Sequence, residues 1–263
     1  MSDEPVIKFS VDEDGVGTLL INRPKVFNAF NQEVVDLWAQ VLNDAASDDA
    51  VKVIVLTGAG KAFCAGGDLD FIEEALDNDP LQNKNFLFEH VHNVARALER
   101  MDKPIIAAVN GAAFGAGMDM ALMCDMRFAA QSATFAESYI AVGLTPGDGG
   151  TYYLPRMIGT AKALELFWSG KTLTADEAKD YGIVNDVFPD DQLLEKTYAF
   201  ARNVASKHQL AIRACKRMVY NGLGASLATN LDMISSQMAI IQTQPGHRDC
   251  VIELLDKIKK RKS

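Results

Sequence analysis

The 263-residue chain has few cysteines, and their spacing suits neither a metal site nor a disulfide framework. Structural zinc sites and small disulfide scaffolds use closely spaced cysteines, often as CxxC pairs. No CxxC pair occurs here, so we expect reduced thiols and no bound metal. The four cysteines are widely separated: Cys64, Cys124, Cys215 and Cys250.

Targeting signals are also lacking near the N-terminus. The segment is acidic at Asp3 and Glu4 and has neither an apolar core nor an Arg-rich amphipathic stretch. Secretory and organelle leaders carry those features, and reduced thiols are typical of the cytoplasm. The sequence therefore predicts a cytoplasmic protein.

An excess of positive charge is absent as well. The net charge is −9 and the isoelectric point is near 5.0, which argues against a general nucleic-acid or membrane partner. A local basic patch could still bind an anionic small molecule. Arg23 with Lys25 is one candidate, and the basic run at 257–262 is another. That run equally suits a solvated helix end, whose dipole favours positive charge.

Several familiar catalytic motifs are missing. The strand at 51–57 leads into Gly58-Ala59-Gly60-Lys61, but a phosphate-binding loop needs a glycine at Val55 and a Ser or Thr at Ala62. No GxGxxG segment opens a helix, and no GxSxG elbow is present. These absences exclude nucleotide hydrolysis, dinucleotide binding and a serine-hydrolase elbow.

A possible metal pair, His90 and His92, has unsuitable spacing. Residues two apart on a helix point in different directions, so these imidazoles would not share one ion. We interpret the pair as part of an exposed helical face.

The most informative segment is the glycine-rich stretch from Asn110 to Asp125. It follows an apolar strand at 105–109 and becomes helical after clustered glycines. A second strand, at 51–57, runs into a similar loop at 58–69. Small residues let a ligand approach the backbone, and a helix start offers free N–H groups. Two such junctions can converge on one carbonyl oxygen as an oxyanion hole; turn formation and helix packing are the alternative reasons for these glycines.

Periodicity divides the chain into an α/β part and a helical tail. A hairpin is expected at 7–21 and a helix at 32–46, followed by alternating strands, glycine loops and helices through residue 160. A long helix is expected at 81–101. Beyond residue 160 strand signals almost vanish, and helices are predicted at 160–169, 174–181, 190–206, 209–222, 225–243 and from about 246.

Several segments resemble the crotonase family, also called the enoyl-CoA hydratase/isomerase superfamily, in the family's order. They cover nearly the whole chain. The matching segments are Asn22-Arg23-Pro24-Lys25, Asn28-Ala29, Ala62-Phe63-Cys64-Ala65-Gly66-Gly67-Asp68-Leu69, Lys103-Pro104-Ile105 through Gly111, Gly115 through Asp125, Gly143 through Thr151, and Leu154-Pro155-Arg156.

The resemblance implies an α/β fold, a crotonase-like spiral of ββα repeats with a C-terminal helical trimerisation region. It places an acyl-CoA-binding core at 1–200 and the helical region at 201–263. Family trimers commonly pair into hexamers, so a homo-trimer or hexamer is expected. The family needs no cofactor, and coenzyme A enters only as part of the substrate.

The family's motif also implies roles for particular residues. The backbone N–H groups of Gly67 and Ala116 would bind the thioester oxygen. Ala116 often corresponds to a glycine in the family, but it keeps the N–H. The residues placed at the CoA-binding loop are Lys25, Ala65, Asp68 and Leu69.

The expected proton-transfer residues depart from the family's pattern. Hydratases of the family use two glutamates twenty residues apart; here Asp119 and Tyr139 occupy those positions. Glu137 lies two residues before Tyr139, on the same face if that segment is extended. Asp148 is one position after a catalytic aspartate of some isomerase and dehalogenase relatives, and it could instead cap a helix at Gly150 or Thr151.

These features predict hydration of an enoyl-CoA or dienoyl-CoA thioester, with Asp119 and Glu137 moving protons and Asp148 or Tyr139 completing the set. Neighbouring carboxyls raise each other's pKa, so one can stay protonated near neutrality. A double-bond isomerase or a ring hydrolase is the first alternative. A non-catalytic acyl-CoA-binding protein is the second. Loss of both usual glutamates favours a substrate unlike a straight-chain enoyl-CoA, such as a cyclic or dienoyl thioester.

Overall fold

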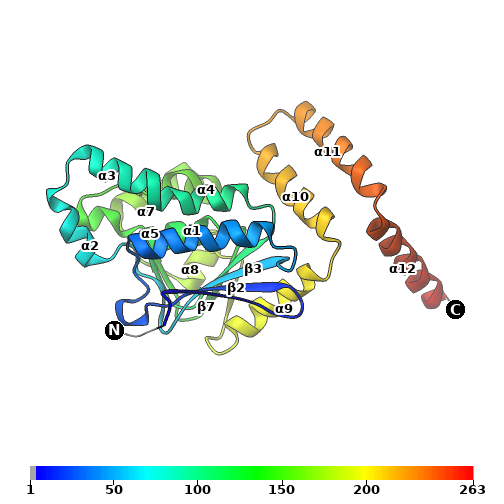
Figure 1. Ribbon diagram of the computed structural model, residues 1–263, viewed down its shortest axis with the longest axis horizontal. Helices are drawn as coiled ribbons and strands as arrows, with labels where there is room; N and C mark the ends of the chain where they lie inside the picture. The colour runs from blue at the N-terminus through cyan, green and yellow to red at the C-terminus, as the bar shows by residue number, and fades with distance from the viewer. Residues whose placement is uncertain (1–3, 263) are drawn as a thin grey trace.

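A computed structural model describes residues 4–262, apart from the side chains of the last two of these. Two β-sheets form its centre (Figure 1). The six-stranded sheet has the order β1-β2-β3-β5-β7-β10, with β1 antiparallel at one edge and the other strands parallel. Its strands are β1 (Ile7–Val11), β2 (Val16–Ile21), β3 (Val53–Gly58), β5 (Ile105–Val109), β7 (Met126–Ala130) and β10 (Asp186–Phe188).

The second sheet is smaller and has the order β4-β6-β8-β9. Three times along the chain, a strand of the large sheet is followed by a strand of the small one, and a helix comes after. This alternation is the ββα repeat that the family resemblance implied, so the fold class is confirmed. The small strands are β4 (Ala62–Cys64), β6 (Ala112–Phe114), β8 (Thr134–Ala136) and β9 (Leu173–Thr174).

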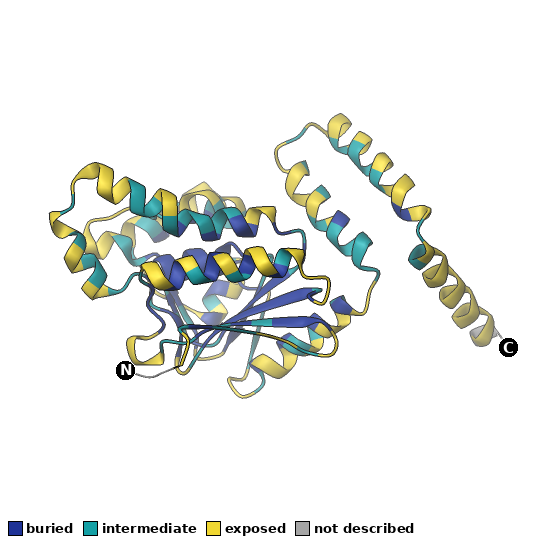
Figure 2. Ribbon diagram, viewed as in Figure 1, coloured by how far each residue is buried: buried dark blue, intermediate teal, exposed yellow. Residues whose placement is uncertain are grey.

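Helices cover the strands (Figure 2), and β3 and β5 are buried along their whole length. A parallel sheet covered on both faces needs such continuous apolar strands. Trp38 and Leu42 of α1 (Gln32–Ser47) are fully buried, and α9 (Leu193–Ala205) packs across the large sheet. The boundary predicted at residue 200 falls inside α9.

Further helices lie between the strands. They are α2 (Leu69–Glu74), α3 (Pro80–Phe86), α4 (His92–Arg100), α5 (Ala116–Leu122), α6 (Gly150–Ile158), α7 (Thr160–Ser169) and α8 (Ala175–Asp180). Short 3-10 turns are η1 (Pro24–Val26), η2 (Ala75–Asp77) and η4 (Ser138–Val142), and η3 (Leu87–Val91) is a π-helical turn. The single helix expected at 81–101 is therefore α3, η3 and α4.

The last three helices form an arm that leaves the body of the molecule (Figure 1). They are α10 (Gln209–Gly222), α11 (Leu227–Gln242) and α12 (Pro245–Lys262). Lys216 of α10 is joined to Asp125 by an ion pair of 2.8 Å, which holds the base of the arm against the end of α5. Among the residues described, no helix is both long and apolar enough to cross a membrane.

Candidate active site

The two glycine loops lie side by side because they follow neighbouring strands of the small sheet. β4 and β6 are parallel partners, so the loops after their carboxyl ends emerge together. The approach is very close: a Cβ placed on Gly117 would lie 2.0 Å from the carbonyl oxygen of Cys64. A Cβ on Gly66 would lie 3.5 Å from the backbone nitrogen of Ala116. No side chain fits at Gly117, whereas Gly66 is favoured as glycine by its positive φ of 96°.

The N–H groups of Gly67 and Ala116 are both available to a ligand. Phe30 forms an isolated β-bridge with this loop: its N–H donates to the Gly66 carbonyl, and its carbonyl accepts from the Asp68 N–H. The N–H of Gly67 takes no part in these bonds. Ala116 is the first residue of α5, where helical N–H groups have no partner within the helix. Within residues 4–262, neither N–H is in a hydrogen bond with the protein. Two free donors on adjacent loops can bind one oxygen.

Two asparagines hold these loops in place. Asn110 accepts from the Gly58 N–H at 3.1 Å and donates to the Gly60 carbonyl at 3.0 Å. Asn28 is fully buried and donates to the carbonyls of Ala59, at 2.9 Å, and Ala62, at 2.7 Å. The turn between β3 and β4 is therefore tied from both sides. Both asparagines belong to segments that resemble the crotonase family, but this supporting role was not predicted from the sequence.

Asp119, Tyr139 and Asp148 meet beside these loops. The Tyr139 hydroxyl lies 2.8 Å from Oδ2 of Asp119 and 2.9 Å from Oδ2 of Asp148. The backbone N–H of Asp148 also donates to Oδ2 of Asp119, at 3.3 Å. Both aspartates are buried, whereas Tyr139 is half-buried. Three of the four predicted catalytic side chains thus form one connected group.

Glu137 lies on another side of Asp119. A Cβ on Gly150 would be 2.1 Å from Oδ1 of Asp119 and 3.2 Å from Oε1 of Glu137, so both carboxyls pack against this glycine. Glu137 is buried, and neither of its oxygens meets an N–H or hydroxyl donor among the described residues; its carboxyl lies against that of Asp119. A buried carboxyl beside a second carboxyl strongly favours the neutral form, from which it can donate a hydrogen bond to its neighbour.

The environment raises the pKa of every acid in the cluster. Burial raises the pKa of Asp148 to about 6, although the hydrogen bond from Tyr139 opposes the change. Burial and the charge of Asp148 raise the pKa of Asp119. Burial and the charge of Asp119 raise the pKa of Glu137 furthest above its ordinary value. Near neutrality the cluster therefore holds both protonated and ionised carboxyls.

Two local arrangements that the sequence left open do not occur. Gly149, not Asp148, precedes the first residue of α6, and no side chain caps that helix. The Asp148 carboxyl accepts from Tyr139 instead. The segment after β8 is also not extended: Tyr139 lies in the 3-10 turn η4, and Glu137 has φ −82° and ψ 71°. The two side chains still reach the cluster, but from different sides.

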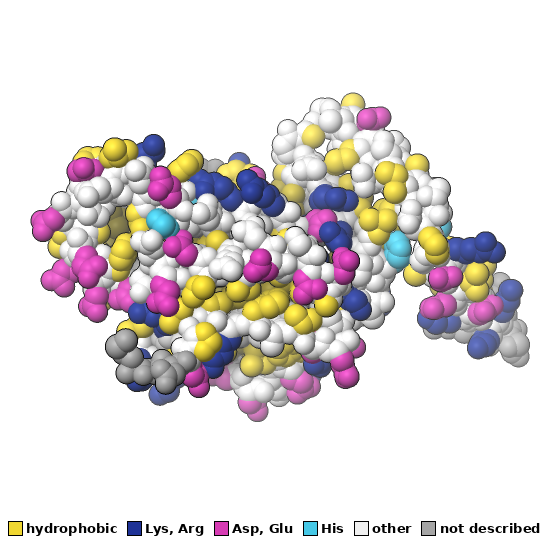
Figure 3. All heavy atoms as spheres, viewed as in Figure 1, with side chains coloured by type: hydrophobic (Ala, Val, Ile, Leu, Met, Phe, Trp, Pro, Cys, Tyr) yellow, Lys and Arg dark blue, Asp and Glu magenta, His cyan; other side chains and the backbone are white. Residues whose placement is uncertain are grey.

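Three of the residues expected to bind CoA, Ala65, Asp68 and Leu69, lie between β4 and the start of α2, whereas Lys25 lies in η1. Asp68 is paired with Arg23 at 2.8 Å and accepts from the N–H of Asp70, which places it in a structural role at the start of α2. Lys25 and Leu69 are exposed, and Ala65 is half-buried. Acidic side chains gather on the surface at the end of the molecule formed by α2 and α3 (Figure 3).

The sequence predicted that His90 and His92 belong to an exposed helical face, and this prediction was wrong. Both are half-buried, and each reaches a different element. His90 Nδ1 lies 2.8 Å from Oδ1 of Asp36 on α1, whereas His92 Nε2 lies 2.8 Å from the carbonyl oxygen of Gly147, next to Asp148. Sequence spacing gave no signal for the second contact.

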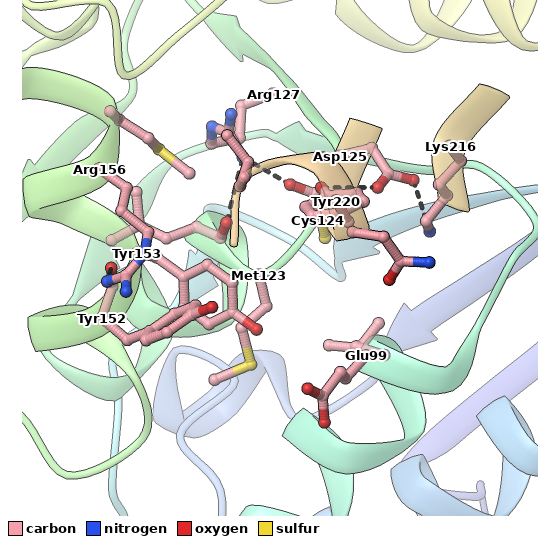
Figure 4. Close-up of a pocket in the computed structure, with 15 residues that line it drawn as sticks. Glu99, Met123, Cys124, Asp125, Arg127, Tyr152, Tyr153, Arg156, Lys216 and Tyr220 are labelled. Atoms are coloured by element: carbon pink, nitrogen blue, oxygen red, sulfur yellow. Dashed lines mark hydrogen bonds and ion pairs between the residues drawn. The ribbon is translucent and has the colours of Figure 1, made fainter. Parts of the chain in front are cut away.

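A cavity of about 380 Å³ lies beside the site, between α6 and α10 (Figure 4). Met123 and Tyr153 line it, and both also pack against Gly149. The four candidate catalytic residues do not line this cavity. Its remaining walls combine apolar side chains with polar ones, which include Asp125, Arg127, Tyr152, Arg156, Lys216 and Tyr220.

Comparisons with known proteins agree with one another. The sequence model of the family described as enoyl-CoA hydratase/isomerase matches residues 12–259. The crotonyl-CoA hydratase of Syntrophomonas wolfei is 33% identical over 94% of each chain. The 1,2-epoxyphenylacetyl-CoA isomerase of Escherichia coli K12 is 34% identical over 93% of this chain and 94% of its own. The crystal structure of an enoyl-CoA hydratase from Bacillus anthracis superposes with a TM-score of 0.91 at 31% identity, covering 96% of this chain and 97% of the other.

Proposed function

The chain belongs to the enoyl-CoA hydratase/isomerase family, and from this premise we propose that it hydrates the double bond of an enoyl-CoA or dienoyl-CoA thioester. The observation that carries hydration is the pair of buried carboxyls, Asp119 and Asp148, joined by the hydroxyl of Tyr139. Addition of water needs one group that accepts a proton and another that donates one.

A proton count supports both roles within this pair. The Tyr139 hydroxyl has one hydrogen but lies within hydrogen-bonding distance of two carboxyl oxygens. Both contacts can be hydrogen bonds only if one carboxyl is protonated and donates to the phenol oxygen. One acid and one base are then present at the same time, and Tyr139 connects them.

The reaction follows from this arrangement. The thioester oxygen accepts hydrogen bonds from the N–H groups of Gly67 and Ala116, which stabilise the negative charge that develops there. The ionised carboxyl takes a proton from water while the water oxygen bonds to Cβ. The protonated carboxyl delivers its proton to Cα. One water is added overall, and the two carboxyls have exchanged protonation states.

Glu137 contributes as a neutral neighbour in this proposal. Its raised pKa keeps it protonated at neutral pH, so it adds no further negative charge beside Asp119. Coenzyme A enters as part of the substrate, beside Lys25, Ala65, Asp68 and Leu69. No cofactor is required for this step.

The proposed substrate is a cyclic or dienoyl thioester rather than a short straight-chain one. Tyr139 stands where family hydratases have a glutamate, and both aspartates have shorter side chains than glutamate. Turnover of crotonyl-CoA should therefore be slower than turnover of a cyclic dienoyl-CoA. Preference for crotonyl-CoA would refute this assignment while leaving hydration intact.

Double-bond isomerisation is the second candidate. An isomerase needs only one base that moves a proton between Cα and Cγ, and the pKa of Asp148 near 6 suits that role at neutral pH. The similarity to the trans-2-decenoyl-[acyl-carrier-protein] isomerase of Streptococcus mutans, 33% identical over 81% of each chain, supports this alternative. Incubation in heavy-oxygen water separates the reactions, because hydration or ring hydrolysis incorporates label and isomerisation does not.

The decisive experiment is mass spectrometry of the purified protein with straight, branched and cyclic enoyl-CoA thioesters. We expect a gain of one water on at least one thioester, and a 10²–10⁴-fold lower rate in Asp119→Asn and Asp148→Asn variants. Full activity in both variants would overturn the assigned roles. Binding of thioesters without any turnover would identify an acyl-CoA-binding protein instead.

We also propose a cytoplasmic location. The cysteines are free, and two of them, Cys215 and Cys250, are exposed, as is usual in a reducing compartment. A relative from Pongo abelii is described as mitochondrial. Fractionation of cells that express the natural gene would distinguish the two locations.

A further inference from the structure

We propose that His92 is a positioning residue that holds the peptide group between Gly147 and Asp148, and so sets the place of Asp148 in the acid cluster. This inference rests on the proposed function for its catalytic consequence. Its structural basis is independent of the reaction.

Both ends of that peptide group are held by side chains. The Gly147 carbonyl accepts from His92 Nε2 at 2.8 Å, and the Asp148 N–H donates to Oδ2 of Asp119 at 3.3 Å. The carbonyl can only accept, so Nε2 of His92 carries the hydrogen. In a trans peptide the C=O and N–H point in opposite directions, and the described residues contain no cis bond. The peptide is thus fixed between α4 and α5.

The π-helical turn η3 makes this contact feasible. Leu87 and His92 are five residues apart, which in an α-helix would separate their directions by about 140°. In a π turn the hydrogen bond runs between residues five apart, and the backbone N–H of His92 does bond to the carbonyl of Leu87. The directions of the two side chains are therefore closer than they would be in an α-helix. Both face Gly147: the methyl carbons of Leu87 are 3.9 Å from the position of a Cβ on that glycine.

Asp148 is buried but makes few other hydrogen bonds. Its carboxyl meets Tyr139, and its backbone N–H meets Asp119. Gly147 and Gly149 flank it, and glycines restrict the backbone least. A turn with such freedom needs an external contact to hold one conformation, and the bond from His92 supplies it.

Two substitutions test the inference, with a matched control on the same helix. His92→Phe keeps a ring but removes the donor, whereas His92→Gln keeps an N–H donor. His90→Phe removes an equivalent imidazole that contacts Asp36 instead. We expect His92→Phe to lower kcat about 10–100-fold, because misplacing a catalytic group by about 1 Å has effects of that size. KM should change much less, His92→Gln should recover most of the rate, and His90→Phe should resemble the wild type.

Hydrogen exchange gives a readout that does not depend on the reaction. The Asp148 amide should exchange faster in His92→Phe than in the wild type or His90→Phe. Unchanged exchange and unchanged kcat in His92→Phe would overturn the inference, as would a loss of rate that His92→Gln does not recover. If the wild type turns over no thioester, the proposed function fails, and the exchange result alone decides the role of His92.

Discussion

At the scale of single residues, the acid cluster combines burial with negative charge. The folding stability of the protein must therefore depend on pH. The folded state binds protons more tightly than the unfolded chain wherever burial raises a carboxyl pKa. Folding stability falls as pH rises from 3.8, the ordinary pKa of an aspartate, to about 6, the pKa of Asp148 in the folded protein. Above this range, Asp148 causes no further decrease.

The variant Asp148→Asn should accordingly be more stable than the wild type at pH 8. Asparagine cannot ionise and can still accept from Tyr139, so the gain should be on the order of 2–3 kcal/mol, and it should shrink towards pH 4.5. Urea unfolding at both pH values measures it, with the exposed Asp191→Asn as control. A gain of equal size at both pH values would contradict the assigned pKa shift.

Gly117 offers a second test at this scale, because the oxyanion loops touch there. A Cβ would lie 2.0 Å from the Cys64 carbonyl oxygen, so Gly117→Ala must push α5 away from β4 and move the Ala116 N–H. Helix propensity alone would favour alanine by about 1 kcal/mol. We expect instead a less stable protein whose kcat falls about 10²–10³-fold, the effect of losing one oxyanion donor.

Gly224 is the matched control for this substitution, because nothing lies within 4 Å of the Cβ position there. Gly224→Ala should leave both unfolding and kcat near wild-type values. Steady-state kinetics with the preferred thioester and urea unfolding compare the two variants. Equal behaviour would show that the contact between the loops does not position the N–H groups.

Some residues of the candidate site could be predicted from the sequence, and others could not. Asp119, Tyr139 and Asp148 were chosen from motif positions, and the structure brings them together. The role of His92 was missed because it depends on a π turn, and a single inserted residue in a helix leaves no periodic signal. Of the two roles left open for Asp148, the helix cap does not occur: its carboxyl accepts from Tyr139, nine residues earlier.

At the scale of elements, long periodic segments were predictable and short ones were not. The helix at Gln32–Ser47 and the buried strand at Ile105–Val109 follow directly from apolar spacing. The strands β4, β6 and β8 have three residues each, too few for alternation to be recognised. Their pairing is set by long-range contacts, and it was expected only from the family resemblance.

Asn110 links two of these elements and gives an element-scale prediction. Its side chain bonds to Thr57 and Gly58 at the end of β3 and to Gly60 and Ala62 on the way to β4. Asn110→Ala removes these bonds and leaves the Gly58 N–H without its partner. We expect a loss of about 2–4 kcal/mol in the free energy of unfolding, together with a lower kcat, measured by urea unfolding and steady-state kinetics.

The half-buried Asn78 provides the comparison for that variant. Its side chain contacts only Asn83 among the described residues, outside the glycine loops. Asn78→Ala should therefore change neither property appreciably. If Asn110→Ala behaves in the same way, the asparagine does not hold the turn between β3 and β4.

At the scale of the whole molecule, the arm exposes apolar side chains that a lone chain would leave in water. Hydrophobic side chains lie at the surface over α10 and α11 (Figure 3). On α12, five large apolar residues are between 40% and 58% exposed: Val251, Ile252, Leu254, Leu255 and Ile258. Most helical stability in proteins comes from packing of an apolar face, so we expect a partner surface to cover these side chains.

We therefore propose that the chain forms a homo-trimer or hexamer through this arm. Light scattering after size exclusion should give three or six times the 28.6 kDa of one chain. The double substitution Leu254→Glu with Leu255→Glu places charges on the apolar surface and should yield smaller species, because burying an unpaired charge is costly. Leu76→Glu, at a residue 77% exposed on the turn after α2, should leave the mass unchanged. A wild-type monomer, or a double variant of undiminished mass, would show that α12 does not form the subunit contact.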